Sequence, residues 1–407
     1  MKQFEASVEE IEKIVRERGD EGVFELTAKY DQAIITKDNF RVSEKDIEEA
    51  YEQVDEDYII AIQNAIDNIA DFHSRQLRNS WMEPDSKGNI LGQVFRPLSR
   101  VGIYVPGGTA AYPSSVLMNA IPAQVAGVKE IVMVSPPDKN GKMNPYTLVA
   151  AAELGLDEIY KMGGAQSVFA LAYGTETVPK VDLISGPGNI YVTIAKKMVY
   201  GTVNIDMLAG PSEILISADK NADPVFLAAD MMSQAEHDVL ARSILVTDSE
   251  ELMDKVEAEL NRQIESLSRK DIIEKALNSY GAFILADDID EACQVSNIIA
   301  PEHLELMVDH PFDLLSKIEN AGAIFMGRYT PEPVGDYYAG PNHILPTGGT
   351  ARFYSPVTVD TFIKASSIIY YSEEGIRQDA DEIIKLATVE GLTAHANSVR
   401  VRKEKIG

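Results

Sequence analysis

Residues 100–107 read RVGIYVPG, a short run of apolar and β-branched residues that ends in a Pro-Gly turn. Segments of the same kind recur along the chain, and helical patterns of ten or more residues alternate with them: 130–137, 180–188, 212–219, 242–249, 282–288 and 303–310. This alternation predicts parallel sheets with helices on both faces. The fold class is therefore α/β.

The rhythm breaks near residues 206–212 and again near residues 354–357, and the breaks divide the chain into four parts. Residues 1–99 are predicted to be mainly helical and to pack on the second α/β unit. Residues 100–212 and 213–355 are the two α/β units. Residues 356–407 form a C-terminal tail too small for a core of its own, so it must pack on its own chain or on another subunit.

Composition excludes several classes of protein. The 407 residues carry 64 Asp and Glu against 37 Lys and Arg, and the net charge of −27 opposes binding to nucleic acid or anionic membrane. The lone cysteine, Cys293, rules out an intrachain disulfide and lies in a helical apolar pattern typical of packing. The N-terminus does not resemble a signal peptide, and no apolar run approaches the roughly 20 residues of a membrane span. A cytoplasmic protein is expected.

Four turns of the first α/β unit are rich in Gly and Pro, and several follow a predicted strand or lead into a helix: 105–115, 162–167, 185–192 and 208–213. Free backbone N–H groups and helix N-termini at one sheet edge bind phosphates and other anions. No turn matches the G-x-G-x-x-G or P-loop pattern. A nucleotide site and ordinary tight turns with positive φ therefore both remain open.

Residues 230–238 read DMMSQAEHD and carry two candidate metal ligands, Gln234 and His237. A helix that begins near Asp223 would place both side chains on one face. Asp336 and His343, in a glycine-bounded loop, and His395, in the tail, are further candidates. Gln234, His237, Asp336 and His395 would make an N/O set suited to zinc, with His343 as an alternative or supporting group.

Adjacent Glu302 and His303 precede a predicted strand and combine a carboxylate that can activate water with an imidazole that titrates near neutral pH. They converge on one ligand only if the turn before the strand is irregular, and a structural histidine is an equal alternative. A turn role for Asp336 also stays open. His73 and His310 are interpreted as surface or structural residues.

Seven strings occur in one order through the chain: residues 100–137, 163–189, 206–213 (DMLAGPSE), 234–238 (QAEHD), 300–306 (APEHLEL), 335–353 and 393–402 (TAHANSVRVR). Together they closely resemble histidinol dehydrogenase, the last enzyme of histidine biosynthesis. The resemblance runs from about residue 80 to the C-terminus, whereas the first 80 residues are similar only in helical character. It implies two Rossmann-like domains without the usual glycine fingerprint.

The resemblance also implies roles for particular residues. It assigns zinc to Gln234, His237, Asp336 and His395, and the general acid/base pair to Glu302 and His303. Substrate contacts fall on these zinc ligands, on His303, and on Ser212 and Glu390. NAD contacts fall on three residues of the first α/β unit: Tyr104, Gln166 and Asn189.

The activity implied is the oxidation of L-histidinol to L-histidine through L-histidinaldehyde, with two NAD reduced per turnover and one zinc ion per subunit. A homodimer whose C-terminal tail crosses to the other subunit is also implied. Two rival interpretations are a related dehydrogenase of another small alcohol, such as a sulfonated diol, and a zinc-dependent binding protein without turnover. The first needs Arg or Lys at the site, where Glu390 is acidic. The second has no need of the Glu302–His303 pair.

Overall fold

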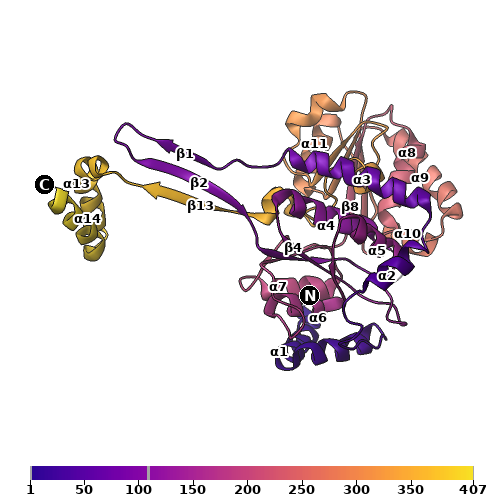
Figure 1. The fold of residues 1–407 in the computed structure, drawn as a ribbon. Coiled ribbons are helices and arrows are strands. Elements are labelled where there is room, and N and C mark those ends of the chain that lie inside the picture. Colours follow the sequence, from indigo (N-terminus) through magenta and orange to yellow (C-terminus); the bar gives the residue numbers. More distant parts are fainter. Residues whose placement is uncertain (1, 108–110, 407) are drawn as a thin grey trace. The chain divides into compact units, whose positions relative to one another are not determined.

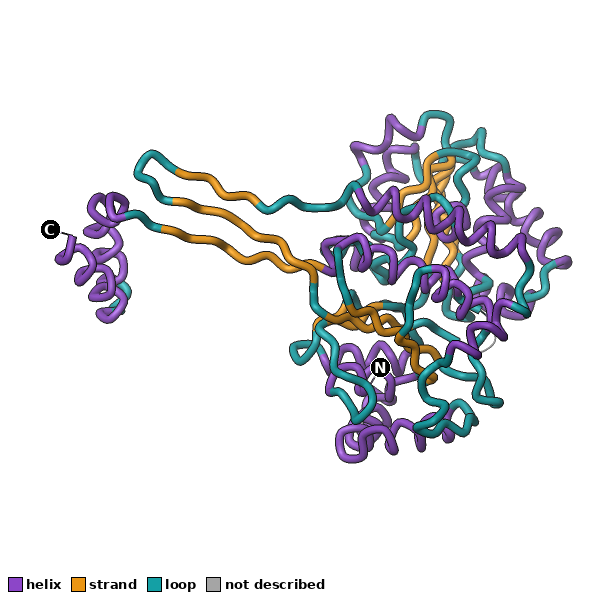
Figure 2. Tube along the Cα trace, viewed as in Figure 1, coloured by secondary structure: helices purple, strands orange, loops and turns teal. Residues whose placement is uncertain are grey.

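The computed structural model describes residues 2–107 and 111–406 (Figure 1). The contacts within it define two units, one made of Met1–Gln76 and Leu98–Phe362 and the other of Leu77–Pro97 and Ile363–Gly407. The first unit holds two five-stranded parallel sheets, and the second holds a three-stranded antiparallel sheet with two helices. Figure 2 distinguishes these strands from the surrounding helices and loops.

The first parallel sheet has the strand order β5-β4-β3-β6-β7. Its strands are β3 (Arg100–Tyr104), β4 (Glu130–Ser135), β5 (Glu158–Lys161), β6 (Leu183–Ser185) and β7 (Asn204–Ile205). The connecting helices are α4 (Pro113–Ala126), α5 (Pro145–Glu153), α6 (Gly164–Tyr173) and α7 (Ile190–Val199). The chain reverses direction across the sheet between β3 and β6, which is the point where ligands bind in folds of this type.

The second parallel sheet repeats this arrangement with the order β10-β9-β8-β11-β12. Its strands are β8 (Glu213–Ala218), β9 (Arg242–Thr247), β10 (Ala282–Leu285), β11 (His303–Met307) and β12 (Ala323–Met326). Its helices are α8 (Pro224–Ala235), α9 (Glu250–Gln263), α10 (Lys270–Tyr280), α11 (Ile289–Ile299) and α12 (Glu332–Tyr337), with the 3₁₀ turns η1 (Ile264–Ser266), η2 (Pro311–Lys317), η3 (Thr350–Arg352) and η4 (Val359–Phe362). The predicted α/β class with two parallel sheets is thus confirmed.

Cys293 lies on α11 and is 1% exposed within the core beneath this sheet, so its predicted packing role is confirmed. Among the described residues, no helix combines the length and the apolar character needed to cross a membrane.

The N-terminal helices are α1 (Lys2–Tyr30), α2 (Glu44–Tyr51) and α3 (Glu56–Ser74). Helix α1 packs against α6 and α7, α2 packs against α5, and α3 packs against α4 and α5. The expectation that this region packs on the second α/β unit was therefore wrong for α1 and α2. Val8, Ile11 and Val15 of α1 complete the core of the first sheet, because they pack in one cluster with Phe169 of α6.

The second unit joins two distant segments through the antiparallel sheet β1-β2-β13. Its strands are β1 (Trp81–Pro84), β2 (Ile90–Pro97) and β13 (Ile363–Tyr370), and its helices α13 (Glu373–Val389) and α14 (Thr393–Ile406) pack on each other. Strand β13 pairs with β2 from Ile363 opposite Pro97 to Tyr370 opposite Ile90. Residues 77–97 therefore belong with the tail and contain two strands, whereas the helices of the N-terminal region end at Ser74.

Candidate active site

Glu302 and His303 lie at the amino-terminal edge of the second sheet, where β11 begins beside β8. Both are buried, and the backbone of Glu213 holds them. The Glu213 N–H donates to Glu302 Oε2 at 2.9 Å, and His303 Nδ1 lies 3.2 Å from the Glu213 carbonyl oxygen. In the neutral ring, this contact places the proton on Nδ1 and leaves on Nε2 the lone pair that a general base requires.

The two side chains converge because the turn before β11 is irregular. Ala300, which ends α11, has φ of 53°, in the left-handed region. The two residues that follow, Pro301 and Glu302, have no regular secondary structure. Glu302 Oε2 lies 3.8 Å from His303 Nδ1, so the pair predicted from the sequence comes together in space.

Acidic groups surround His303. Its Nδ1 lies 3.9 Å from Glu332 Oε1, and its Nε2 lies 3.6 Å from Asp336 Oδ1. Burial alone would lower the pKa of His303, but the carboxylates of Glu332, Glu302 and Asp336 outweigh it and raise this pKa well above its usual value. Burial raises the pKa of Glu302 to about 8 and that of Glu332 to about 7.

The site as a whole has an excess of acidic groups. Besides burial, the charged side chains that shift the pKa values of Glu302, Glu332 and Asp336 belong to other carboxyl groups and to histidines. Burying several carboxylates together is unfavourable unless a cation or protons compensate their charge. The cluster therefore has the charge of a site that binds a cation.

Gln234 lies in the last turn of α8, with none of its surface exposed. Neither atom of its side-chain amide has a hydrogen-bond partner within the described residues. A buried amide without a partner is costly, so its oxygen is available to a ligand. His237 lies in the turn after α8, because the helix ends at Ala235, and the expectation of one continuous helical face is therefore wrong.

His237 nonetheless remains beside the cluster. Its backbone N–H donates to the Gln234 carbonyl oxygen at 3.2 Å. Burial lowers the pKa of His237 and so favours the neutral ring, which is the form that binds metals.

Asp336, on α12, has its pKa raised by burial and lowered more strongly by His303, His343 and His237, so its pKa falls below the usual value. His343 Nδ1 lies 3.0 Å from the Asp336 carbonyl oxygen, which agrees with a supporting role for His343.

One group of three acidic or histidine side chains in the described part of the chain has its potential ligand atoms within 4.8 Å of one another: His303, Glu332 and Asp336. Asp336 is common to this group and to the set predicted from the sequence. Asp336 is therefore a candidate ligand in both groupings, whereas Glu332 and His303 belong only to the group seen in the structure.

A cavity of about 340 Å³ joins the two sheets' domains beside this cluster. Ala111, Tyr112 and Ser114 line it from the first domain, and His237 and Tyr337 line it from the second. Residues 108–110 of the predicted glycine loop lie outside the described residues. A ligand in this cavity would touch both the glycine loop and the His237 turn.

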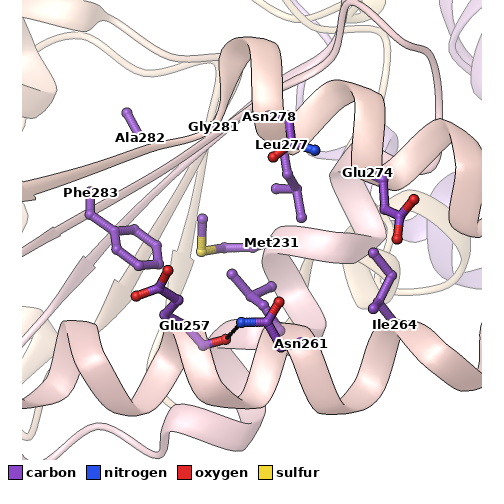
Figure 3. A pocket seen from close by; sticks show the side chains of 11 residues that line it. Met231, Glu257, Asn261, Ile264, Glu274, Leu277, Asn278, Gly281, Ala282 and Phe283 are labelled. Atoms are coloured by element: carbon purple, nitrogen blue, oxygen red, sulfur yellow. Dashed lines mark hydrogen bonds between the residues drawn. The ribbon is translucent and has the colours of Figure 1, made fainter.

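Figure 3 shows a different cavity, of about 370 Å³, between α9 and α10. Met231, Leu277 and Phe283 form its apolar floor, and the exposed Glu257 and Glu274 lie at its rim. Its lining contains no histidine and none of the residues predicted for catalysis, metal or cofactor. Cavity size therefore does not mark the active site.

The three residues predicted to contact NAD lie at the carboxyl edge of the first sheet. Tyr104 ends β3, and its buried hydroxyl accepts the Gly164 N–H at 3.2 Å. Gln166 follows β5, and its buried Nε2 has no partner in the described chain. Asn189 follows β6 and caps α7, where its Oδ1 accepts from two backbone N–H groups. Tyr104 and Asn189 thus flank the switch point between β3 and β6.

The predicted substrate residues divide between the two units. Ser212 directly precedes Glu213 at the start of β8, beside the catalytic pair. Glu390 ends α13, and His395 lies in the first turn of α14, both exposed. Gln234, His237, Glu302, His303, Asp336 and Ser212 are therefore all in the first unit, and Glu390 and His395 belong to the second.

Comparisons with known proteins identify the family of this chain. The family model of histidinol dehydrogenase matches residues 1–403. A histidinol dehydrogenase from Heliobacterium mobile is 60% identical over 98% of this chain and 93% of its own length. The chain belongs to the histidinol dehydrogenase family. A second relative of that name, from Carboxydothermus hydrogenoformans, is 56% identical over 98% of this chain and 93% of its own.

The structure agrees equally well with the histidinol dehydrogenase family. The crystal structure of histidinol dehydrogenase from Elizabethkingia anophelis matches with a TM-score of 0.95 and 40% identity, over 99% of this chain and 93% of that one. The resemblance seen in the sequence is therefore confirmed, and the protein is an oxidoreductase of histidine biosynthesis.

Three acidic residues of this histidinol dehydrogenase site were not predicted from the sequence. They are Glu213, Glu305 and Glu332, all at least nine-tenths buried. A signal exists for two of them. Glu305 interrupts an apolar strand two residues after His303, and Glu332 precedes Asp336 by one helical turn.

Proposed function

We propose that this enzyme oxidises L-histidinol to L-histidine in two NAD-dependent steps at a site that holds one zinc ion per subunit. The observation that carries the proposal is the arrangement of His303. Its Nδ1 contacts a backbone carbonyl, its Nε2 lies 3.6 Å from Asp336 Oδ1, and the buried amide of Gln234 has no partner in the described residues. A base with a free Nε2 next to candidate metal ligands suits the oxidation of a chelating amino alcohol.

The residues fit a zinc ion. Gln234, His237 and Asp336 would hold it from the first unit, and His395 would supply the fourth ligand; all four offer N or O atoms that zinc accepts. The buried Gln234 amide lacks a partner in the described residues, and the site gathers the carboxyl groups of Glu302, Glu332 and Asp336. When bound, zinc would neutralise part of this charge and fix the amine and ring nitrogen of the substrate.

The protein groups would act in sequence. In the first step, His303 takes the hydroxyl proton through Nε2 as the carbinol hydride passes to NAD, which leaves the aldehyde. In the second step, Glu302 takes a proton from water, the water adds to the aldehyde, and the hydrate loses a second hydride to a second NAD. The buried positions of Glu302 and His303 would keep the reactive aldehyde away from bulk solvent.

NAD would bind the first domain. There a cavity of about 260 Å³, lined by Pro106, Gly107 and Ser135, opens at the carboxyl ends of β3 and β4. At the switch point of the second sheet, between β8 and β11, only about 10 Å³ is left, where the Asp309 N–H donates to Asp219 and Asn221 donates to Asp309. Carboxylates in this filled crevice repel a pyrophosphate, so the first domain suits the dinucleotide better.

A homodimer would bring the second unit to the site. This unit exposes many large apolar side chains within the described residues: Trp81, Met82, Leu91, Ile369, Tyr370, Leu386, Val389, Leu392 and Val401. Exposed apolar side chains in such number on one small unit suit an interaction surface. The C-terminal segment would then deliver Glu390 and His395 to the partner subunit, where Glu390 meets the cationic substrate.

The function is tested by following NADH absorbance with purified enzyme and L-histidinol, and in parallel with a sulfonated diol. The proposal predicts NADH formation with L-histidinol alone. NADH formation only with the sulfonated diol would indicate a dehydrogenase of another alcohol. Zinc binding with no turnover of either compound would indicate a binding protein.

The metal assignment is tested by measuring zinc content and affinity in Gln234→Ala and Glu332→Gln. If Gln234 is a ligand, Gln234→Ala loses zinc, whereas Glu332→Gln still binds it with an affinity at most about 10–100-fold weaker, the usual range for changes beside a metal ligand. The reverse order would place the ion among His303, Glu332 and Asp336 instead.

A further inference from the structure

A buried pair of carboxyl groups lies behind the catalytic cluster and has no part in the mechanism above. Asp230 of α8 is 6% exposed and Glu305 of β11 is fully buried. The two carboxyl groups interact with each other, and neither Asp230 Oδ2 nor Glu305 Oε2 has a hydrogen-bond partner in the described residues. Burying two carboxyl groups together costs free energy, which suggests that the pair has a role in the protein.

Glu305 is connected to each element that carries the site. Side chains alternate along a strand, so Glu305 and His303 lie on the same face of β11. Glu305 Oε1 accepts the backbone N–H of Glu332, the first residue of α12, at 2.9 Å. This N–H has no partner inside its own helix. Glu305 therefore joins the strand of the base to the helix that carries Asp336.

The contact with Asp230 extends this connection to α8. Residues four apart on a helix lie one above the other, so Asp230 lies one turn before Gln234, and Glu332 lies one turn before Asp336. Helices α8 and α12 also pack on each other. Glu305 thus contacts the residue one turn before each of two proposed zinc ligands.

We propose that Glu305 is a positioning residue: through Asp230 and the Glu332 N–H, it sets the spacing between Gln234, Asp336 and His303. The inference rests on the metal assignment proposed above. It concerns the geometry of the site and not its chemistry, because Glu305 touches neither His303 nor any group assigned to the substrate. The side chain thus connects β11 with α8 and α12.

The chemistry of the pair indicates a discriminating variant. Two carboxyl groups in contact cannot both ionise, and burial raises the pKa of Asp230 to about 6 and that of Glu305 well above its usual value. One proton is therefore shared between them. Glutamine has the same shape as a protonated glutamate: its oxygen can accept from Glu332, and its amide can donate to Asp230. Leucine fills similar space and makes neither contact.

The experiment compares zinc affinity, by competition with a chromophoric chelator, and kcat and KM in the wild-type enzyme, Glu305→Gln and Glu305→Leu. Glu305→Gln is expected to stay within about threefold of wild type. Glu305→Leu is expected to lose about 10–100-fold in zinc affinity, the usual effect of removing a group that orients metal ligands. Asp230→Ala, which keeps the Glu332 contact, is expected to fall between them and serves if Glu305→Leu does not fold.

Ser217→Ala is the control. Ser217 is buried on β8 of the same sheet, and its hydroxyl contacts Ser296 of α11 at 3.0 Å, so the variant loses a buried hydrogen bond without touching the pair. It is expected to lower thermal stability and leave zinc affinity unchanged.

Wild-type zinc affinity in both Glu305→Leu and Asp230→Ala would overturn the inference, as would an equal loss in Glu305→Gln and Glu305→Leu. A wild-type enzyme that binds no zinc would instead refute the metal assignment, and this inference with it.

Discussion

Glu213 holds both members of the catalytic pair through its backbone, and its side chain is tied down as well. Glu213 Oε1 accepts the Gly348 N–H at 2.8 Å, and Arg242 lies 3.5 Å from its other oxygen. Because the N–H of Glu213 binds Glu302 and its carbonyl binds His303, the two groups cannot exchange roles by rotating. This fixed arrangement supports separate tasks, with His303 as the base for the alcohol and Glu302 as the base for water.

The division of tasks predicts different defects in two variants. Glu302→Gln should slow the oxidation of L-histidinaldehyde more than that of L-histidinol, because it removes the group that activates water. His303→Asn should slow alcohol oxidation more. Losing a general base costs about 10²–10⁴-fold in rate. Single-turnover NADH formation from each compound measures the two steps, and equal losses of both steps in both variants would contradict the division.

His73, on α3, was interpreted from its polar neighbours as a surface or structural residue, and the structure buries it completely. Its Nδ1 lies 2.8 Å from Gln76 Oε1, while its Nε2 has no partner in the described chain. Burial lowers the pKa of His73, and the bond to Gln76 only partly opposes this. The folded protein therefore keeps the ring neutral at pH values where the unfolded chain binds a proton.

A stability effect with a definite sign follows. The contribution of His73 is complete above the unfolded pKa of about 6.5 and is lost as pH falls from there through the lower folded pKa. The free energy of unfolding lost in His73→Leu should therefore shrink between about pH 7.5 and pH 5.5. Urea titrations at both pH values measure it, with the exposed His310→Leu as the control. A penalty that grows on acidification would have the wrong sign.

Single acidic residues of the site could not be selected from the sequence, because 64 Asp and Glu residues look alike until burial separates them. Glu302 and His303 were found because their types match a chemistry and their neighbours match a family. Glu213 was not predicted as a site residue, because its backbone, and not its side chain, holds the pair. A role of the backbone cannot be read from the type of a residue.

At the scale of elements, a buried ion pair fixes the loop that leads from β6 into α7. Lys196 of α7 pairs with Asp206 after β7, and both side chains are at least nine-tenths buried. Lys196 also donates to the Gly186 carbonyl oxygen at 3.0 Å, and Asp206 Oδ2 accepts the Gly186 N–H at 2.8 Å. The two charges thus hold both polar groups of Gly186, three residues before the proposed NAD ligand Asn189.

Breaking this pair should be costly. Lys196→Met leaves Asp206 buried without its cation, which costs about 3–5 kcal/mol of unfolding free energy. Its neighbour Lys197 is 54% exposed and lies 3.8 Å from Glu5, so Lys197→Met should cost less than about 1 kcal/mol. Urea unfolding of both variants measures the difference. Equal, small losses would show that Asp206 is compensated by other groups.

The elements themselves were predictable to different degrees. The two parallel sheets follow from runs such as EIVMVS, because strands buried on both faces are apolar throughout. Strands β1 and β2 lack that signal, since most of their residues are partly or fully exposed. Strand β13, which pairs with β2, also lies more than 260 residues away from it in the chain. Pairing over that distance leaves no local pattern in the sequence.

At the scale of the whole molecule, the proposed ligands Glu390 and His395 belong to the second unit, whereas the other proposed metal and substrate residues belong to the first. Both flank Gly391, whose φ of 74° allows the tight turn between α13 and α14. The two residues therefore lie at either end of the short connection between α13 and α14. A tail that crosses to the partner subunit of a homodimer would place them at its site.

A mixing experiment tests this crossing. His303→Asn and His395→Asn subunits are each expected to be inactive alone. In a two-fold dimer with crossed tails, a mixed dimer contains one site with both wild-type residues, so random pairing restores about one quarter of wild-type activity. Co-expression with two affinity tags supplies the mixed dimer. No recovery in the isolated mixed dimer would indicate that each tail serves its own subunit.

The most direct test of the whole account is the number of NADH molecules formed per L-histidinol consumed to completion, before and after metal removal. We expect the enzyme to form two NADH per L-histidinol, to lose activity when a chelator removes the metal, and to regain activity when zinc is returned. One NADH per L-histidinol, or full activity without metal, would contradict it.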